Sequence, residues 1–150
     1  MKSVWLTAAL LALLAGVLFA QPGAVQPGIR FQAVDIFVDP QNQPLAAFQL
    51  EFSAKGSGAK VVGVEGGQHE AFKDAPYYDP RAIQQERVVI AAFNTAPPGG
   101  LPKQKTRIAT IHLQTDGRRR PRYAIDRILG ATSDGKEIAV TVTLEERMPK

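Results

Sequence analysis

Two neighbouring runs with the periodicity of β-strands, Arg87–Phe93 and Thr106–Leu113, constrain the fold of this chain most strongly. The first run is apolar at every position after Arg87, which is typical of a strand that is covered on both faces. The second run is typical of a half-buried strand, because apolar residues share one face and polar residues the other (Ala109, Ile111 and Leu113 against Thr110 and His112). Together the two runs predict a packed sandwich with the first run at its centre.

The N-terminal residues differ in composition from the rest of the 150-residue chain. The apolar run Val4–Phe19 follows a single charge at Lys2, and Ala20 places a small residue before Gln21. This order predicts a signal peptide over residues 1–20, with an N-terminal signal helix, and hence a secreted or periplasmic protein. The alternative is an uncleaved anchor, but a helix over this run would span about 25 Å, less than a hydrocarbon core of about 30 Å. We therefore expect a membrane as a partner only if the signal is uncleaved.

The remainder of the chain is predicted to consist of three segments. Residues 21–28, rich in Pro, Gly and Gln, predict a flexible lead-in, residues 29–145 one domain, and residues 146–150 a frayed tail. The chain has no Cys, so an exported domain of this kind must be stabilised by its core alone. The net charge of +4 is mild and does not identify a partner.

Further strands are predicted from five runs: Ile29–Asp39, Leu45–Ser53, Ala59–Glu65, Tyr123–Ala131 and Glu137–Leu144. In the first of these the apolar positions change from odd to even numbers, which predicts a bulge or a strand that moves between sheets. Pro80 after Asp79 predicts a short helix through Gln85 with Asp79 as its N-cap. Five aromatic residues of the strands are expected to lie mostly in the core: Phe31, Phe37, Phe48, Phe52 and Phe93. The pattern indicates an all-β, antiparallel sandwich.

The order of these segments resembles that of cohesin-like domains. Ala46–Phe52 followed by Val61–Glu65 resembles their early strands, and Val88–Phe93 resembles their central strand. Arg107–Leu113 is similar to their "L-A-T-I-x-F" strand, and Asp134-Gly135 before a Val/Thr strand resembles their closing hairpin. The resemblance covers about residues 31–144.

The resemblance implies a jelly-roll-type β-sandwich of about eight or nine strands, shared by cohesins and some carbohydrate-binding modules. Those domains are non-catalytic, since cohesins bind dockerins and the modules bind polysaccharide. The segment Gln68–Glu86 and the Arg-rich turn after Leu113 have no counterpart in the pattern.

Sites with catalytic or metal-binding chemistry are not indicated. His69 and His112 are the two histidines, they are far apart in the sequence, and no H-E-x-x-H spacing or Cys accompanies them, so we expect no metal and no cofactor. There is no G-x-S-x-G motif. The Asp and Glu residues are scattered, which leaves open a hydrolase whose carboxylates are paired only in space.

Two groups of residues are candidate binding sites. Tyr77 and Tyr78 are adjacent aromatic residues in an irregular segment and would suit stacking on a sugar, or else would cap the edge of the sandwich. The densest positive charge, which would suit acidic polysaccharide or phosphate or else form a solvated loop, consists of Arg118, Arg119, Arg120 and Arg122. No aromatic residues are interleaved with these arginines, so we expect no nucleic-acid partner.

The sequence therefore predicts an exported, non-catalytic binding or protein–protein interaction module, whose partner is a protein or a polysaccharide in the cell envelope or outside the cell. Direct polysaccharide binding is the first alternative, and a hydrolase with dispersed carboxylates is the second.

Overall fold

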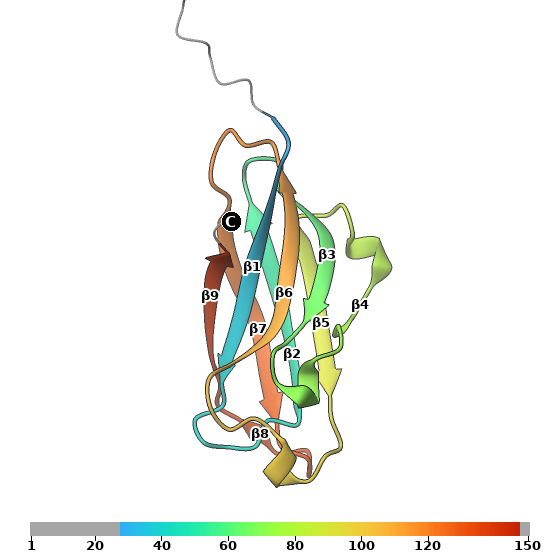
Figure 1. Ribbon diagram of the computed structural model, residues 1–150, viewed down its shortest axis with the longest axis vertical. Helices are drawn as coiled ribbons and strands as arrows, with labels where there is room; N and C mark the ends of the chain where they lie inside the picture. Colours follow the sequence, from blue (N-terminus) through green and yellow to red (C-terminus); the bar gives the residue numbers. More distant parts are fainter. Residues whose placement is uncertain (1–27, 148–150) are drawn as a thin grey trace, which may run out of the picture.

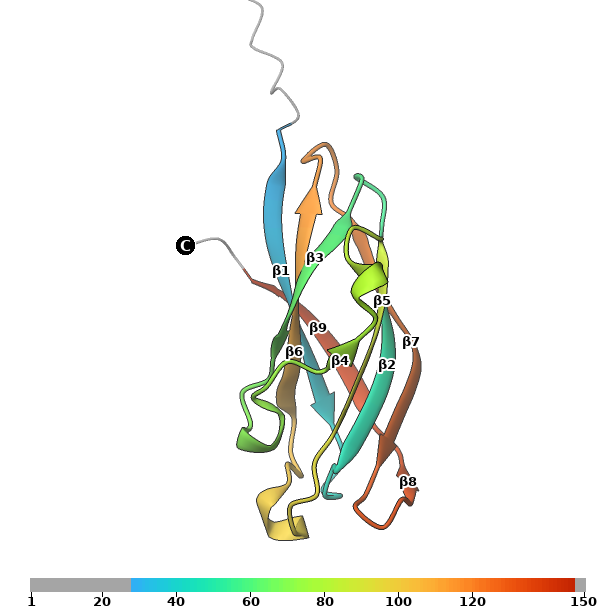
Figure 2. The ribbon, with the colours of Figure 1, turned by 90° about the vertical axis from the view of Figure 1, so that its right-hand side faces the viewer.

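A computed structural model describes residues 28–147, which form two antiparallel sheets packed face to face (Figures 1 and 2). The four-stranded sheet A has the order β3 (Lys60–Gly66), β6 (Thr106–Thr115), β1 (Arg30–Asp39), β9 (Thr141–Arg147). The five-stranded sheet B has the order β4 (Tyr77–Tyr78), β5 (Arg87–Phe93), β2 (Ala47–Lys55), β7 (Arg122–Ala131), β8 (Glu137–Ile138). The predicted antiparallel sandwich is confirmed, while the predicted signal peptide and all but the last residue of the lead-in lie outside the described residues.

Single 3-10 turns are the helical elements of the described range: η1 (Glu70–Phe72), η2 (Pro80–Ala82) and η3 (Pro98–Gly100). Asp79 is the N-cap of η2, as predicted, and its side chain accepts a hydrogen bond from the Arg81 amide. The turn ends at Ala82 and does not reach Gln85. Over residues 28–147 no helix has the length and apolar character needed to cross a membrane.

The core lies between the two sheets and is built from alternate strand residues, which all point inward because the side-chain period of a strand is two. Phe48, Leu50 and Phe52 of β2 are buried against Val34, Ile36 and Val38 of β1, among others. Figure 2 shows the sandwich from its side, with β1, β3 and β6 in one layer and β2, β5 and β7 in the other. The core positions predicted for Phe48 and Phe52 of β2 are confirmed.

Two expectations about covered strands are wrong. The run Arg87–Phe93 forms β5, but its outer face is open, since Val89 is 45% exposed and Phe93 is 79% exposed. Phe31 is also exposed and Phe37 is only half-buried, and neither lies in the core, because both share the outward parity of Asp35 on the outer face of sheet A. The change of parity in β1 therefore marks the exposed start of the strand; the register shift between β1 and β6 lies further along, at Ile36/Phe37.

The predicted last strand, Glu137–Leu144, is divided between the two sheets. Its first residues form β8 beside β7, and its later residues form β9 beside β1. Residues 145–147 were expected at the end of the domain or in a frayed tail, but they belong to β9 and pair with residues 33–35 of β1. The remaining three residues of the predicted tail lie outside the described residues.

A bulge in β7 determines which side chains of that strand face outward. Gln49 pairs with Leu129 and Glu51 pairs with Asp126, so β7 has two residues opposite Leu50. Arg127 lies at this point with φ 52°, a conformation that non-glycine residues seldom adopt. Residues three apart in a regular strand face opposite sides, and the extra residue therefore places both Leu129 and Asp126 on the outer face of sheet B.

Candidate functional site

The outer face of sheet B carries an apolar patch, which we define as Ala47, Tyr77, Ala91, Phe93 and Leu129. Tyr77 pairs with Ala91, Ala47 with Phe93, and Gln49 with both Ala91 and Leu129, so the register of four strands brings these residues together. They line a shallow groove of about 420 Å³. Tyr77 is 78% exposed and Leu129 is 49% exposed. Apolar side chains gathered in this way mark a surface that gains free energy when a partner covers it.

The predicted pair Tyr77 and Tyr78 does not act as one surface. The two residues form β4, and neighbouring residues of a strand point to opposite faces. Tyr77 points outward, while Tyr78 is half-buried and packs against the core. The companions of Tyr77 in the structure are therefore Phe93 and Leu129. The exposure of Phe93 could not be predicted, because an all-apolar run indicates a buried strand. The outward position of Leu129 could not be predicted either, because it depends on the bulge in β7.

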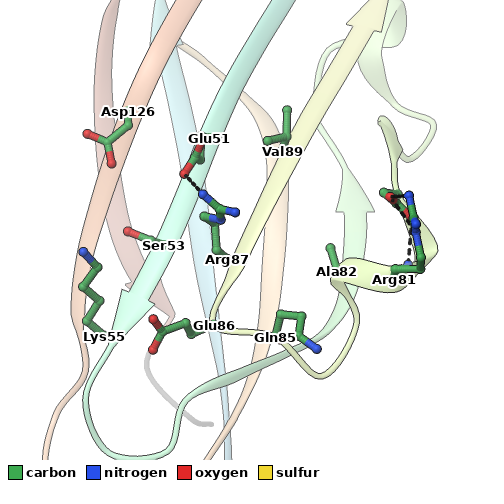
Figure 3. Close-up of a pocket in the computed structure, with 11 residues that line it drawn as sticks. Glu51, Ser53, Lys55, Arg81, Ala82, Gln85, Glu86, Arg87, Val89 and Asp126 are labelled. Carbon is green, nitrogen blue, oxygen red and sulfur yellow. Dashed lines mark hydrogen bonds and ion pairs between the residues drawn. The ribbon is translucent and has the colours of Figure 1, made fainter.

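A polar groove of about 740 Å³ adjoins the apolar patch toward the other end of the same face (Figure 3). Figure 3 shows Glu51 and Arg87 pointing toward each other at its centre, with Asp126 on β7 at one side. Arg87 Nη1 lies 3.1 Å from Glu51 Oε1, and the Glu51 side chain is only 11% exposed. Arg81 of η2 and its N-cap Asp79 form a second ion pair, which lines the groove on the side opposite Asp126. The groove thus presents charges of both signs beside the apolar patch.

The floor of this groove contains a hydroxyl group with no hydrogen-bond partner among the described residues, Ser53 Oγ. Beside it, Glu51 and Asp126 lie directly opposite each other across β2 and β7. The structure therefore pairs two carboxylates in space, as the hydrolase alternative requires. Glu51, however, accepts a hydrogen bond from Arg87, so one of its carboxylate oxygens already has a partner within the protein. The arrangement suits recognition of polar groups better than acid–base chemistry.

The outer face of sheet A is closed by its own polar side chains. Thr110 Oγ1 donates to Asp35 Oδ1 at 2.6 Å and accepts hydrogen bonds from Arg107 and Arg147. Arg147 also donates to both oxygens of the Asp35 carboxylate, at 2.8 and 3.1 Å. We call these four residues the Asp35 cluster. Thr110 was expected on a polar outer face, yet it is fully buried because the two arginines cover it.

This cluster holds Asp35 in its charged form. Burial by itself would raise the pKa of the Asp35 carboxyl group, but the hydrogen bonds from Arg147 and Thr110 and the charges of Arg147 and Arg107 outweigh burial and lower the pKa. Both oxygens of the Asp35 carboxylate and the Thr110 hydroxyl group thus have hydrogen-bond partners within the protein, so these buried groups do not need a second molecule to satisfy them.

The histidines have structural roles in the folded chain. His69 is the N-cap of η1, where its Nδ1 accepts a hydrogen bond from the Ala71 amide. His112 lies on the outer face of sheet A, 3.0 Å from the Glu65 carboxylate. Within residues 28–147 no group of three or more His, Asp or Glu side chains is arranged to hold a metal ion.

The four predicted arginines lie at one end of the sandwich, in and after the hairpin between β6 and β7 (Figure 1). All four are exposed, and Arg120 makes an ion pair with Glu146 at 3.5 Å. Arg122 pairs with Lys55, at the opposite end of β2 from Ala47 in the apolar patch. The structure therefore separates the two groups of predicted site residues, and they cannot form one site.

Comparisons with known proteins identify a similar fold but no related sequence. No protein-family model matches the chain, and no match is found among curated proteins. Among solved structures, the chain is similar to a non-cellulosomal cohesin from the hyperthermophilic archaeon Archaeoglobus fulgidus, with a TM-score of 0.58 and 11% sequence identity over 75% of each chain. The chain therefore has a cohesin-like fold, in agreement with the resemblance noted in the sequence.

Proposed function

We propose that this chain is an exported protein-interaction module that receives its partner on the outer face of sheet B. The observation that carries this proposal is the distribution of exposed apolar side chains. Six large ones are exposed in the described residues, and four of them lie on this one face: Tyr77, Val89, Phe93 and Leu129. Contiguous exposed apolar patches mark interaction sites, and Tyr is among the residues enriched at interface hot spots.

The polar groove supplies the rim that a specific interface needs. Charged groups at a rim contribute more to the choice and orientation of a partner than to affinity. Arg87 and Glu51 satisfy each other before binding, so a partner that covers them need not leave a buried charge unpaired. We infer a partner with an apolar centre and flanking charges of both signs.

A dockerin-type module is the first partner to test, and the cohesin-like fold supports it. The test measures binding of the full chain to a panel of dockerin modules, using wild type and a variant with Tyr77→Ser, Phe93→Ser and Leu129→Ser. We expect affinity to fall at least about 100-fold, because each such anchor contributes about 2 kcal/mol or more.

The matched control changes three outward positions of sheet A, one half-buried and two exposed: His112→Ala, Thr141→Ala and Thr143→Ala. It should bind within about twofold of wild type, because surface changes away from an interface cost little. Equal losses in the two variants would contradict the assignment of the face. Absence of binding to every module in the panel would contradict the dockerin-type partner.

Export is proposed from the order of Lys2, the apolar run Val4–Phe19 and Ala20. Mass spectrometry of the protein recovered from its native cells should give a mature chain that begins at Gln21. A species that retains Trp5 would indicate an uncleaved anchor instead.

Neutral glycan is a second candidate ligand for the same patch, because Tyr77 and Phe93 both expose an aromatic ring there. Stacking of a sugar on such rings involves no net charge, so retention on a neutral glycan should change little with salt. Tyr77→Ala should abolish the retention and Tyr78→Phe should preserve it. Retention that disappears at high salt would exclude this mode of binding.

A further inference from the structure

Positive charge is concentrated at the end of the sandwich where β1 begins, well away from the apolar patch (Figure 1). Seven of the chain's eighteen Lys and Arg residues lie on the three segments that form this end: Arg30, Lys55, Lys60, Arg118, Arg119, Arg120 and Arg122. We call them the basic end. All seven are exposed.

Direct contacts hold these three segments together. The Asp116 amide donates to Ser57 O at 2.9 Å, which joins the β6–β7 hairpin to the β2–β3 hairpin. Gly117 lies against the start of β1, since a Cβ at this position would be 2.8 Å from Gly28 O and 3.1 Å from Arg30 Nε. Gly117 also has φ +67°, which a side chain would disfavour. Contacts between the three segments therefore fix the positions of their backbones relative to one another at the basic end.

Few acidic side chains offset this charge. Asp116 is occupied in its own turn, where it accepts a hydrogen bond from the Arg118 amide at 3.0 Å. Glu146 contacts Arg120, whose side chain is still 76% exposed. Glu86 borders Lys55 across the polar groove. With these three acidic residues counted, the basic end has a net charge of +4, whereas the other charged residues of the described chain, nine basic and eleven acidic, have a net charge of −2.

Two exposed apolar side chains lie at the same end. Ile29 is 68% exposed and Phe31 is 71% exposed, and Arg30 lies between them. They are the two large exposed apolar residues that the proposed docking face does not include. Cations beside apolar side chains suit a lipid–water interface, where the charges meet phosphates and the apolar groups enter the acyl boundary. A soluble acidic polymer would leave Ile29 and Phe31 uncovered.

We propose that the basic end docks on the surface of an anionic phospholipid bilayer, with Ile29 and Phe31 inserted at the headgroup level. The position of the apolar run in the sequence agrees with this orientation. Residues 20–27 connect Phe19 to Gly28, and eight residues reach at most about 28 Å. While the run is in a bilayer, before the cleavage at Gln21 proposed above, the basic end is thus the part of the domain that lies near the headgroups. The outer face of sheet B then remains open to a partner.

The first test measures sedimentation of the mature chain, which begins at Gln21, with vesicles of phosphatidylcholine alone and of an equal mixture with phosphatidylglycerol, at low and high salt. Arg118→Ser, Arg119→Ser, Arg120→Ser and Arg122→Ser together should reduce the preference for anionic vesicles at least about tenfold, since each Arg near such a surface contributes about fivefold. High salt should remove the same preference. The mature chain lacks the apolar run Val4–Phe19, so vesicle binding depends on the folded domain.

The matched control removes four charges elsewhere, with Lys73→Ser, Lys103→Ser, Lys105→Ser and Lys136→Ser. It should retain the preference for anionic vesicles. Loss of this preference in the Lys variant as large as that in the Arg variant would mean that net charge drives adsorption, which would overturn the proposal. Binding of dextran sulfate that depends on the four arginines, without vesicle binding, would also overturn it.

The second test places a single Trp in the mature chain, either by Phe31→Trp or by Phe93→Trp, since the one natural Trp, Trp5, precedes Gln21. Anionic vesicles should shift the emission of Trp at position 31 to the blue and shield it from aqueous quenchers, and should leave Trp at position 93 unchanged. No shift at position 31, or equal shifts at both positions, would overturn the proposed orientation.

Discussion

The outer faces of the two sheets differ in whether their outward side chains have partners within the chain. Both sheets alternate inward and outward residues, but the centre of the outer face of sheet A is occupied by polar groups that bind one another, the Asp35 cluster. Sheet B places Tyr77, Phe93 and Leu129 outward, with no side chains above them. The comparison shows that alternation of inward and outward residues does not distinguish a solvent-exposed surface from a binding surface. That distinction depends on whether the outward groups are satisfied within the chain.

The largest effect is expected from comparing two Phe residues on opposite faces of sheet B. Phe48→Ala should lower the free energy of unfolding by about 3–5 kcal/mol, because it leaves a cavity beside Phe72, whose ring centroid is 5.2 Å away. Phe93→Ala should change it by less than about 0.5 kcal/mol, because its ring is already in water. Chemical denaturation of the two variants checks this. Similar losses would mean that Phe93 is needed for stability and not for binding.

A smaller loss of stability should follow from disrupting the Asp35 cluster. Asp35→Asn should cost about 1.5–3 kcal/mol, since it removes charged hydrogen bonds to Arg147 and leaves Thr110 and Arg107 poorly matched. Glu145→Gln, which disrupts the exposed pair with Lys105, should cost at most about 1 kcal/mol and serves as the control. Equal costs would show that the outer face of sheet A is no better ordered than an ordinary surface.

The same cluster predicts a pH dependence of stability. The pKa of Asp35 is lowered in the folded chain, so its stabilising contribution is present above the unfolded pKa of about 3.9 and is lost as pH falls through the folded pKa. Thermal unfolding of wild type and Asp35→Asn should therefore show a difference that is constant near neutral pH and shrinks below about pH 4. A difference that persists unchanged into strong acid would exclude Asp35 as the titrating group.

The strands were predictable from the sequence because alternation reports directly on which residues face the core. Phe48, Leu50 and Phe52 are buried as that pattern predicts. The exposure of Phe93 was not predictable, because an all-apolar run is the same whether a neighbouring layer covers it or a partner does. Leu129 joins the patch only through the bulge at Arg127, and nothing in the sequence marks that residue for a positive φ.

The sequence also did not predict that the run Glu137–Leu144 is divided between the two sheets. Ile138, Val142 and Leu144 keep one alternation across the break, so the pattern does not show where the chain leaves β7 for β1. The clustering of Arg30 with the hairpin arginines depends on tertiary contacts at Gly117, and separate runs of sequence cannot indicate it.

The most direct test of the central claim is photo-crosslinking in the cells that produce the chain. A photoreactive phenylalanine analogue, p-benzoylphenylalanine, is placed at position 93 on the outer face of sheet B or, as the matched position, at Phe37 on that of sheet A. The proposed docking face predicts a discrete protein adduct from position 93, abolished by Tyr77→Ser with Leu129→Ser, and none from position 37. No adduct from position 93, or adducts of equal yield from both positions, would contradict it.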